Sequence, residues 1–243
     1  MRLTRSFVDL PLQVGAEVPL PDGVAAHLLR VLRLGAGDEC VLFNGDGHDY
    51  HARIATAGKR HATAGILRTS RVDTESTLRI TLLQGIARGE KMDWILQMAS
   101  VLDVARILPV TSDRSEVKLD AQRADKRLAH WRGIVIAACE QSGRAVVPEV
   151  APPQALAAAA ALRDGRGVIL DPFAEASVSA LPCDSPGACT IAIGPEGGWS
   201  PRDRGQLVEA GFDGLRLGPR VLRTETAGIA AIAVLQARFG DLR

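Results

Sequence analysis

The stretch CTIAIGPEGGWSPRD, residues 189–203, joins an apolar run to a polar one through a loop rich in glycine. The apolar, partly β-branched run at 189–193 predicts a buried strand. Ser200, Pro201 and Asp203 predict a helix N-cap, a first-turn proline and an acidic capping partner. A strand, a glycine loop and a capped helix in this order indicate an α/β domain with a parallel sheet.

Strand-like and helix-like runs alternate over most of the chain after residue 78. Short apolar runs with turn residues at their ends predict strands, and apolar residues at helical spacing predict helices. This alternation again indicates a parallel α/β sheet. The expected strands cover 78–84, 105–111, 167–171, 189–194 and 214–218, and the expected helices cover 91–104 and roughly 121–142.

Residues 1–72 have a different rhythm, with short apolar pieces separated by Gly, Asp and Asn. Such spacing is typical of a small β-barrel. One helix is expected within it, over 24–34, with Gly35 as its C-cap. We therefore expect two domains, 1–72 and 73–243, joined at the polar stretch 71–77.

The composition of the 243 residues is that of an ordinary globular protein, with 47% apolar and 23% charged residues. The formal net charge of +1 excludes a uniformly basic coat for nucleic acid. Binding to RNA would therefore depend on where cations are placed. No signal peptide is evident and ALAAAAAL at 155–162 is too short to span a bilayer, so we expect a cytoplasmic protein.

The cysteines and histidines show no spacing typical of a metal site. Cys40, Cys139, Cys183 and Cys189 include no CxxC pair, and four of the five histidines are scattered over 27–61. We expect thiols without a special role in a reducing compartment, and no metal.

Each of the last three expected strands ends in an unusual loop: LDPFAE (170–175), IGPEGGWSPRD (193–203) and LGPRVLRTETAG (217–228). Because ligands bind outside the carboxyl ends of strands in open α/β sheets, three such loops indicate a ligand site. Glu196 would repel a pyrophosphate, and neither GxGxxG nor a P-loop is present, so a dinucleotide is disfavoured. A cationic or zwitterionic ligand such as a sulfonium amino acid fits better.

Together, IGPEGGWSPRD and LGPRVLRTETAG resemble the uracil-N(3) methyltransferases of 16S ribosomal RNA in the SPOUT superfamily. The resemblance extends over nearly the whole chain, through HLLRVLRLGAGDE (27–39), RGEKMDWILQ (88–97), SDRSEVK (112–118) and AACEQSGRAVVPEV (137–150). It implies a trefoil-knotted parallel α/β domain after a PUA-like β-barrel that binds RNA. It also implies S-adenosyl-L-methionine as methyl donor, a homodimer with active sites at the subunit interface, and a uridine of the assembled small (30S) subunit as substrate.

The resemblance assigns the cofactor to the three loops. The implied cofactor-binding residues are Leu170, Asp171, Pro172, Ile193, Gly194, Pro195, Gly197, Gly198, Leu217, Gly218, Val221, Leu222, Thr226 and Ala227.

Removal of the uracil N(3) proton leaves negative charge that an arginine near O2 or O4 would stabilise. Arg223 and Arg114 are the candidates for this role, and the general base is Glu196, Glu140 or a water. Capping of the last helix does not require Arg223 or Glu225, so both are available to face the substrate or to fix the loop. The negative charge of Glu225 also suits a helix N-terminus. The candidate RNA-binding residues are Arg30 and Arg33, on one face of the first helix, with Arg88, Lys91 and Arg144.

One segment departs from the family pattern. QMASVLDV (97–104) has Met98, Val101 and Asp103 where the family typically shows Lys, Glu and Gly. This departure leaves open a second hypothesis, a non-catalytic RNA-binding or ribosome-assembly protein that kept the fold. A nucleotide-dependent dehydrogenase is disfavoured because GxGxxG and its downstream ribose-binding acid are absent.

Overall fold

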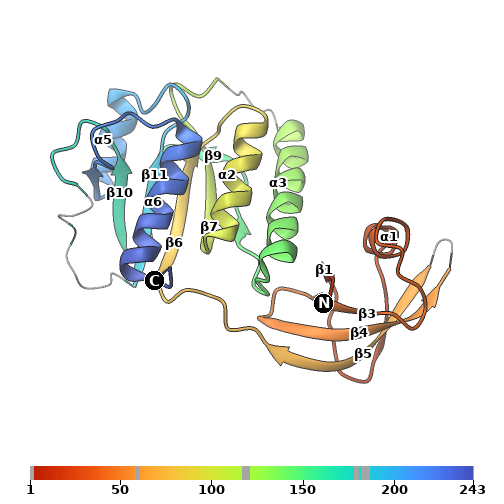
Figure 1. Cartoon of the computed structure of the whole chain (residues 1–243). Coiled ribbons are helices and arrows are strands. Elements are labelled where there is room, and N and C mark those ends of the chain that lie inside the picture. The colour runs from red at the N-terminus through yellow and green to blue at the C-terminus, as the bar shows by residue number, and fades with distance from the viewer. Residues whose placement is uncertain (1–2, 59–60, 117–120, 178–180, 182–186, 243) are drawn as a thin grey trace. The chain divides into compact units, whose positions relative to one another are not determined.

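The computed structural model describes residues 3–58, 61–116, 121–177, 181 and 187–242 (Figure 1). The chain forms two compact units. The first comprises Met1–Glu75 together with Cys139–Val147, and the second comprises Ser76–Ala138 together with Pro148–Arg243. The segment 139–147 therefore belongs with the first unit, although it lies far from it in the sequence.

The first unit is built on a five-stranded mixed sheet in the order β1-β3-β4-β5-β2. β1 pairs with β3 in parallel and the other pairs are antiparallel. Leu28, Leu42 and Ile66 lie in its aliphatic core, which fits the scarcity of aromatic residues. The elements of this unit are β1 (Arg5–Phe7), β2 (Glu17–Pro19), α1 (Asp22–Ala26), η1 (His27–Val31), β3 (Glu39–Phe43), β4 (His48–Ala57) and β5 (Ala62–Arg71).

The helix of the first unit is shorter than the sequence predicted. α1 continues into the π-helical turn η1, which ends at Val31, and Arg33 then adopts a positive φ of 59°. The N–H of Leu34 donates to the carbonyl oxygen of Leu28, which closes the turn without Gly35. The expectation that the helix reaches residue 34 and is capped by Gly35 is therefore wrong.

The second unit contains a seven-stranded sheet in the order β12-β10-β11-β6-β7-β8, with β9 also paired to β7. Each pair in this sheet is parallel, as the alternating pattern predicted. Its strands are β6 (Arg79–Gly85), β7 (Val104–Thr111), β8 (Glu149–Val150), β9 (Gln154–Ala155), β10 (Arg166–Leu170), β11 (Ala188–Ile193) and β12 (Phe212–Leu215).

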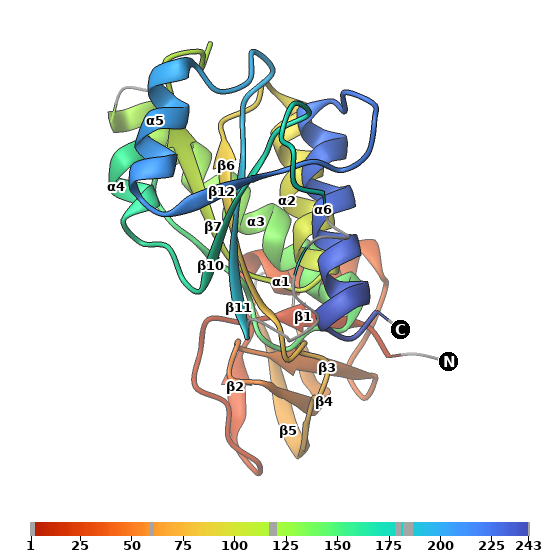
Figure 2. The same cartoon turned by 90° about the vertical axis from the view of Figure 1, so that its left-hand side faces the viewer.

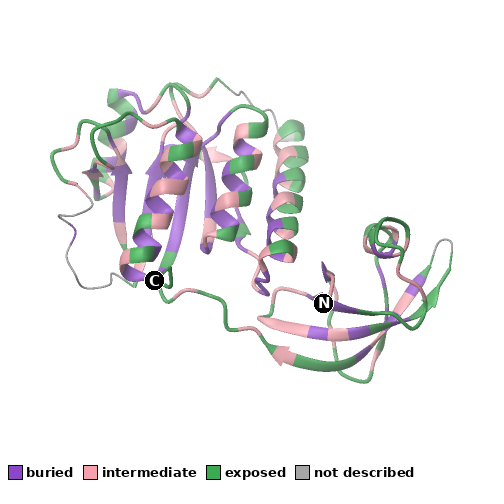
Figure 3. Ribbon diagram, viewed as in Figure 1, coloured by how far each residue is buried: buried purple, intermediate pink, exposed green. Residues whose placement is uncertain are grey.

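Helices cover both faces of this sheet. α6, α2 and α3 lie side by side over one face, and α4 and α5 lie on the other (Figures 1 and 2). The central strands are buried, whereas the outer surfaces of the helices are exposed (Figure 3). The helices are α2 (Glu90–Val101), α3 (Ala121–Ser142), α4 (Leu156–Ala160), α5 (Pro201–Glu209) and α6 (Thr224–Phe239).

The chain returns from the edge of the sheet to its middle between β12 and α6. β12 pairs only with β10 at the edge among the described strands, yet α6 packs against α2 and β11. β12 ends at Leu215, whereas the sequence predicted a strand to residue 218. Residues 216–223 are therefore free to form the connection that reaches α6.

Several features of the described residues bear on membranes, thiols and metals. No helix among them is both long and apolar enough to cross a bilayer. Cys40, Cys139 and Cys189 are buried free thiols, and Cys183 lies outside the described residues. In the same part of the chain, no three His, Cys, Asp or Glu side chains gather as metal ligands.

Candidate active site at the carboxyl ends of the strands

A cavity of about 580 Å³ opens in the second unit where three parallel strands end. Leu170, Ile193 and Leu215 are the terminal residues of β10, β11 and β12, and all three line it. The volume lies in the range of pockets that hold small organic ligands. The other lining residues are Lys91, Arg114, Asp171, Pro172, Phe173, Gly194, Pro195, Glu196, Gly197, Gly198, Trp199, Arg204, Leu217, Arg220, Val221, Leu222, Arg223, Thr224, Glu225 and Ala227.

The glycine loop after β11 packs closely against the end of β6. A Cβ atom on Gly85 would lie 2.5 Å from the ring of Pro195, which is too near for any side chain. Gly198 has a φ of +65° and so takes a conformation that favours glycine. Arg114 fixes the loop from the other side, because its Nη1 donates to the carbonyl oxygen of Gly197 at 2.9 Å.

Below the loop, α5 begins as the sequence predicted. The hydroxyl of Ser200 accepts from the N–H of Asp203 at 3.0 Å, and the Asp203 carboxylate accepts from the N–H of Ser200 at 3.0 Å. This reciprocal pair is a complete capping box with Pro201 in the first turn. The Ser200 hydroxyl also bonds to the carboxylate of Asp113 at 2.7 Å, which ties the loop after β7 to the same helix end.

The carboxylate of Glu196 binds the loop before α2. It accepts from the N–H of Arg88 at 3.1 Å and lies 3.3 Å from Nζ of Lys91. Burial alone would raise the pKa of Glu196, but these donors and its own backbone N–H outweigh it and lower the pKa below the ordinary value. A carboxylate held in this way is a weak base, which favours a role in ordering the glycine loop.

The last loop is fastened to the glycine loop through Thr224, the first residue of α6. Its hydroxyl donates to the carbonyl oxygen of Gly194 at 2.6 Å and accepts from Nε2 of Gln84 at 3.2 Å. No side chain caps α6; instead the carbonyl oxygen of Arg223 accepts from the N–H groups of Thr226 and Ala227. The start of α6 is therefore tied to the ends of two neighbouring strands, β6 and β11.

The first loop is fixed by a buried ion pair. Asp171 is 5% exposed, and its carboxylate accepts from Nη2 of Arg204 at 2.5 Å and from the N–H of Phe173 at 3.0 Å. The Arg204 guanidinium lowers the pKa of Asp171, against burial that would raise it. The Asp171 side chain is thus occupied in holding its own loop.

The cavity wall combines spare cations with unpaired polar atoms. Among the described residues, the guanidinium groups of Arg220 and Arg223 have no hydrogen bond or ion pair. Within the same set, the buried atoms Trp199 Nε1 and Glu225 Oε2 also have no partner. Buried polar atoms are rarely left unpaired, so the wall fits a ligand that carries a hydrogen-bond acceptor and a cationic group.

The candidate residues from the sequence meet at this cavity with few exceptions. Arg223, Arg114 and Glu196 line it, as do all the candidate cofactor residues other than Gly218 and Thr226. Gly218 and Thr226 are exposed and do not line the cavity. Four further lining residues, Phe173, Trp199, Arg220 and Thr224, lie in the three predicted loops but were not named as cofactor residues. Arg204 on α5 and Leu215 at the end of β12 lie outside those loops, and the sequence reasoning missed them.

The candidate RNA-binding residues lie in different surroundings. Lys91 lines the cavity, and exposed Arg88 pairs with Glu116. Arg30 and Arg33 are exposed, but Arg33 lies beyond the helix, so the expected shared helical face is wrong. Residues 117 and 118 of the SDRSEVK motif lie outside the described residues.

Arg144 is a correction to the sequence expectation. It is 3% exposed, and its Nη2 and Nε donate to the Glu75 carboxylate at 2.5 and 3.0 Å. A buried guanidinium in a two-point ion pair is not available to a phosphate. Glu140, the other candidate base, accepts from the N–H of Phe7 at 2.9 Å within the first unit and does not line the cavity.

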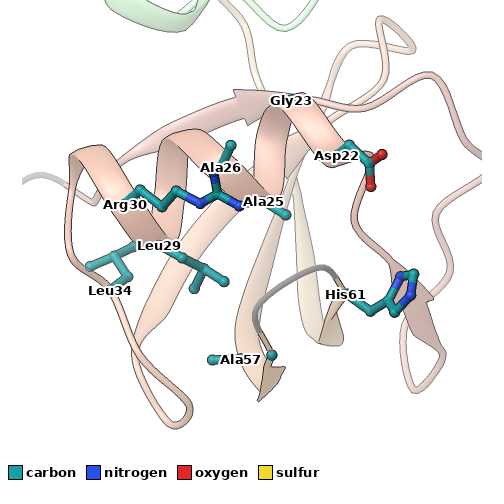
Figure 4. Close-up of a pocket in the computed structure, with 10 residues that line it drawn as sticks. Asp22, Gly23, Ala25, Ala26, Leu29, Arg30, Leu34, Ala57 and His61 are labelled. Carbon is teal, nitrogen blue, oxygen red and sulfur yellow. The ribbon is translucent and has the colours of Figure 1, made fainter.

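The first unit has a cavity of its own, of about 1070 Å³, between α1–η1 and the ends of β4 and β5. Figure 4 shows Ala25, Leu29 and Arg30 on the helical turns, with Ala57 and His61 on the segments across from them and Asp22 at the start of α1. It offers one cation, one carboxylate and one imidazole beside apolar surface.

Known proteins match the chain over its whole length. The RNA methyltransferase domain family matches residues 74–236, and the RNA methyltransferase PUA domain family matches residues 20–67. A curated relative, ribosomal RNA small subunit methyltransferase E of Buchnera aphidicola (subsp. Schizaphis graminum), is 31% identical and aligns over 99% of this chain and 98% of its own.

Two solved structures are similar in both sequence and fold. Ribosomal RNA small subunit methyltransferase E of Neisseria gonorrhoeae, bound to S-adenosyl methionine, has a TM-score of 0.92 and 40% identity over all of both chains. A methyltransferase of Legionella pneumophila, also solved with that cofactor, has a TM-score of 0.95 and 37% identity over all of both chains.

These matches confirm the resemblance and the predicted fold class, a parallel α/β domain that follows a PUA-type domain. The cavity at the strand ends lies within the residues that the RNA methyltransferase domain family matches. The chain belongs to the RNA methyltransferase family, together with the ribosomal RNA small subunit methyltransferase E proteins.

Proposed function

We propose that this protein transfers a methyl group from S-adenosyl-L-methionine to N(3) of a uridine in small-subunit (16S) ribosomal RNA. The observation that carries the proposal is the convergence of three strand-end loops on one cavity, whose wall holds Arg223, a cation without a partner among the described residues. The Legionella and Neisseria proteins were solved with this cofactor, and the Neisseria and Buchnera proteins are ribosomal RNA small subunit methyltransferases E.

The cavity suits the proposed cofactor. Leu217, Val221 and Leu222 supply apolar surface for the adenine, and the backbone of 193–198 supplies hydrogen-bonding groups. The unpaired Trp199 Nε1 would meet an acceptor, and the unpaired carboxylate oxygen of Glu225 would favour the positive charge of the amino acid portion. When bound, S-adenosyl-L-methionine supplies an electrophilic methyl group.

The residues of the chain would position the uracil and stabilise its charge. As the N(3) proton leaves, negative charge develops on O2 and O4 of the uracil, and the guanidinium of Arg223, which the described part of the chain leaves unpaired, would donate to it. Arg114 is held at the Gly197 carbonyl, so we assign it chiefly to ordering the loop. Because Glu196 is held by its donors, we assign it to ordering the glycine loop, and we assign loss of the N(3) proton to exchange with solvent before the methyl group is transferred.

We assign the recognition of RNA mainly to residues 1–72 and the transfer to residues 73–243. Exposed Arg30 and Arg33 in the first unit and Arg88 and Lys91 near the cavity suit phosphate contacts. We further propose that the assembled small subunit is the substrate, which would place the reaction in the cytoplasm.

We also propose a homodimer through the outer face of α2 and α6. Trp94 and Val101 on α2 and Val234 on α6 are exposed, and the two helices pack against each other. Large apolar side chains gathered on one exposed face favour a protein contact.

The test is methyl transfer from labelled S-adenosyl-L-methionine to small ribosomal subunits isolated from cells that lack this protein. Digestion of the product should yield labelled 3-methyluridine and no other labelled nucleoside. Free 16S ribosomal RNA is the matched substrate, because it separates recognition of the particle from recognition of the sequence. Label in another nucleoside would overturn the N(3) assignment.

The alternative, a non-catalytic RNA-binding protein, predicts a different pair of results. It requires RNA binding without label transfer, and no rise in the melting temperature with S-adenosylhomocysteine. A ligand present at 100 times its Kd stabilises the folded state by about 2.7 kcal/mol, so cofactor binding would be readily visible.

A further inference from the structure

Phe173 is, of the described residues, the most exposed large apolar side chain, at 84% exposed. It lies in the loop after β10 and lines the cavity at the strand ends. An aromatic ring left in water loses the stabilisation that burial would give. Aromatic residues are enriched where proteins contact a partner, so a ring exposed at the rim of a site favours a contact surface.

The backbone that carries Phe173 is held firmly. Its N–H donates to Oδ1 of Asp171, and the N–H of Ala174 donates to the carbonyl oxygen of Asp171. Asp171 in turn is buried, pairs with Arg204, and donates its own N–H to the carbonyl oxygen of Leu215. The exposure of the ring thus belongs to a fixed loop, and a ring fixed in advance loses little entropy on binding.

An exposed cation that lines the same cavity suits a nucleic acid. Arg220 is exposed and has no hydrogen bond or ion pair among the described residues. Aromatic rings stack on unpaired bases of any identity, and guanidinium groups bind phosphates. An aromatic ring with a spare cation nearby therefore favours a single-stranded polyanion over a second protein chain.

We propose that Phe173 stacks on an unpaired base of the RNA substrate and so holds the target nucleotide at the mouth of the cavity, while Arg220 binds a neighbouring phosphate. This inference rests on the proposed methyl transfer to RNA and names the residue that selects an unstacked strand. A base must leave its stack in the RNA before N(3) can react. Stacking on the ring of Phe173 would offset part of the free energy lost when the base leaves its neighbours.

The test compares Phe173→Ala, Phe173→Leu and Phe173→Trp with the unaltered protein. We expect Phe173→Ala to raise KM for small ribosomal subunits about 5- to 100-fold, the range for loss of one stacked base. Phe173→Trp should stay within about twofold, and Phe173→Leu should resemble Phe173→Ala because it lacks a π face. The matched control is Val208→Ala on α5, an apolar residue that is 61% exposed and lines none of the described cavities.

Two further measurements separate this inference from its alternatives. The Kd for S-adenosyl-L-methionine should be unchanged in Phe173→Ala; a weaker cofactor Kd would assign the ring to the cofactor site and overturn the inference. If Phe173→Ala sediments as a monomer and the unaltered protein as a dimer, the ring contacts a second copy of the chain, and the inference is overturned. If the unaltered protein transfers no methyl group, the proposed function fails; if it does and Phe173→Ala has the same KM, only the stacking role fails.

Discussion

Thr224 donates a 2.6 Å hydrogen bond to the carbonyl oxygen of Gly194, so the first residue of α6 is tied directly to the glycine loop after β11. The same hydroxyl accepts from Gln84 at the end of β6. One buried hydroxyl thus joins the ends of two adjacent parallel strands to the helix that follows the last loop. The geometry of the cavity at the strand ends depends on this junction.

We expect Thr224→Val to lower the free energy of unfolding by about 1–3 kcal/mol, because it leaves the buried Gly194 oxygen without its hydroxyl donor. Nε2 of Gln84 loses one acceptor but keeps its 2.8 Å bond to the carbonyl oxygen of Gly85. The Kd for S-adenosyl-L-methionine should rise as the loops lose their register. Thr224→Ser, which retains the hydroxyl, is the matched control and should keep most of the affinity. Urea denaturation measures the stability and calorimetric titration measures the Kd. If Thr224→Val and Thr224→Ser have the same stability and the same Kd, the hydroxyl does not hold the loops together.

Glu196 gives a prediction that depends on pH. Its folded-state pKa is lowered, so the stability it contributes is fully present above the ordinary carboxyl value of about 4.3 and is lost as the pH falls through the lower folded value. Glu196→Gln should therefore be less stable than the unaltered protein at neutral pH, and the difference should vanish in acid.

The same substitution tests the role of Glu196 in catalysis. A carboxylate ionised throughout the neutral range creates no titration near pH 7, so Glu196→Gln should keep the shape of the pH profile of kcat. Its rate should fall less than about 100-fold, the lower limit for losing a general base. Loss of the acidic limb of that profile would restore Glu196 as the base.

Arg223 should matter for the rate more than for binding of the cofactor. We expect Arg223→Ala to lower kcat about 10²- to 10³-fold, the cost of removing one donor from a developing oxyanion, with the Kd for S-adenosyl-L-methionine within about threefold. Arg223→Lys should recover part of the rate, since it keeps the charge but not the planar fork. Arg202→Ala on α5 is the control, because this exposed arginine lies outside the cavity. A large rise in the cofactor Kd with kcat unchanged would contradict this role.

Sequence reasoning predicted the features that depend on neighbours in the chain. The parallel strands, α2, α3 and the capping box of Ser200 and Asp203 follow from local patterns. The junction at Thr224 and the Asp171–Arg204 pair join residues about 30 apart, and no spacing rule specifies them. Arg144 was misassigned for the same reason, because its partner Glu75 is 69 residues away.

The proposed dimer can be tested on α2. We expect Trp94→Glu to dissociate the dimer, because a carboxylate would replace the largest exposed apolar side chain of α2. Val208→Glu on α5 introduces the same charge at a residue of similar exposure and should leave the dimer intact. Sedimentation equilibrium measures both, and a dimeric Trp94→Glu would show that the contact lies on another face.

The departure from the family pattern at residue 103 has a structural explanation. Asp103 has a φ of 62°, in the left-handed region, at the position where the family typically has Gly. Asp tolerates this conformation better than most residues. Its Oδ2 also accepts from the N–H of Ser76 at 2.6 Å, which fixes the start of the second unit to the turn between α2 and β7.

Substitutions at Asp103 should separate the backbone cost from the hydrogen bond. Asp103→Ala loses the bond to Ser76 and places a β-carbon in a strained conformation, so we expect a loss of about 2–3 kcal/mol in the free energy of unfolding. Asp103→Gly loses the bond but relieves the strain and should lose only about 1 kcal/mol. Asp103→Asn keeps an acceptor and tolerates the conformation, and should be the closest to the unaltered protein. Urea denaturation gives the order, and an Ala variant as stable as the Gly variant would show that the positive φ imposes no cost at this turn.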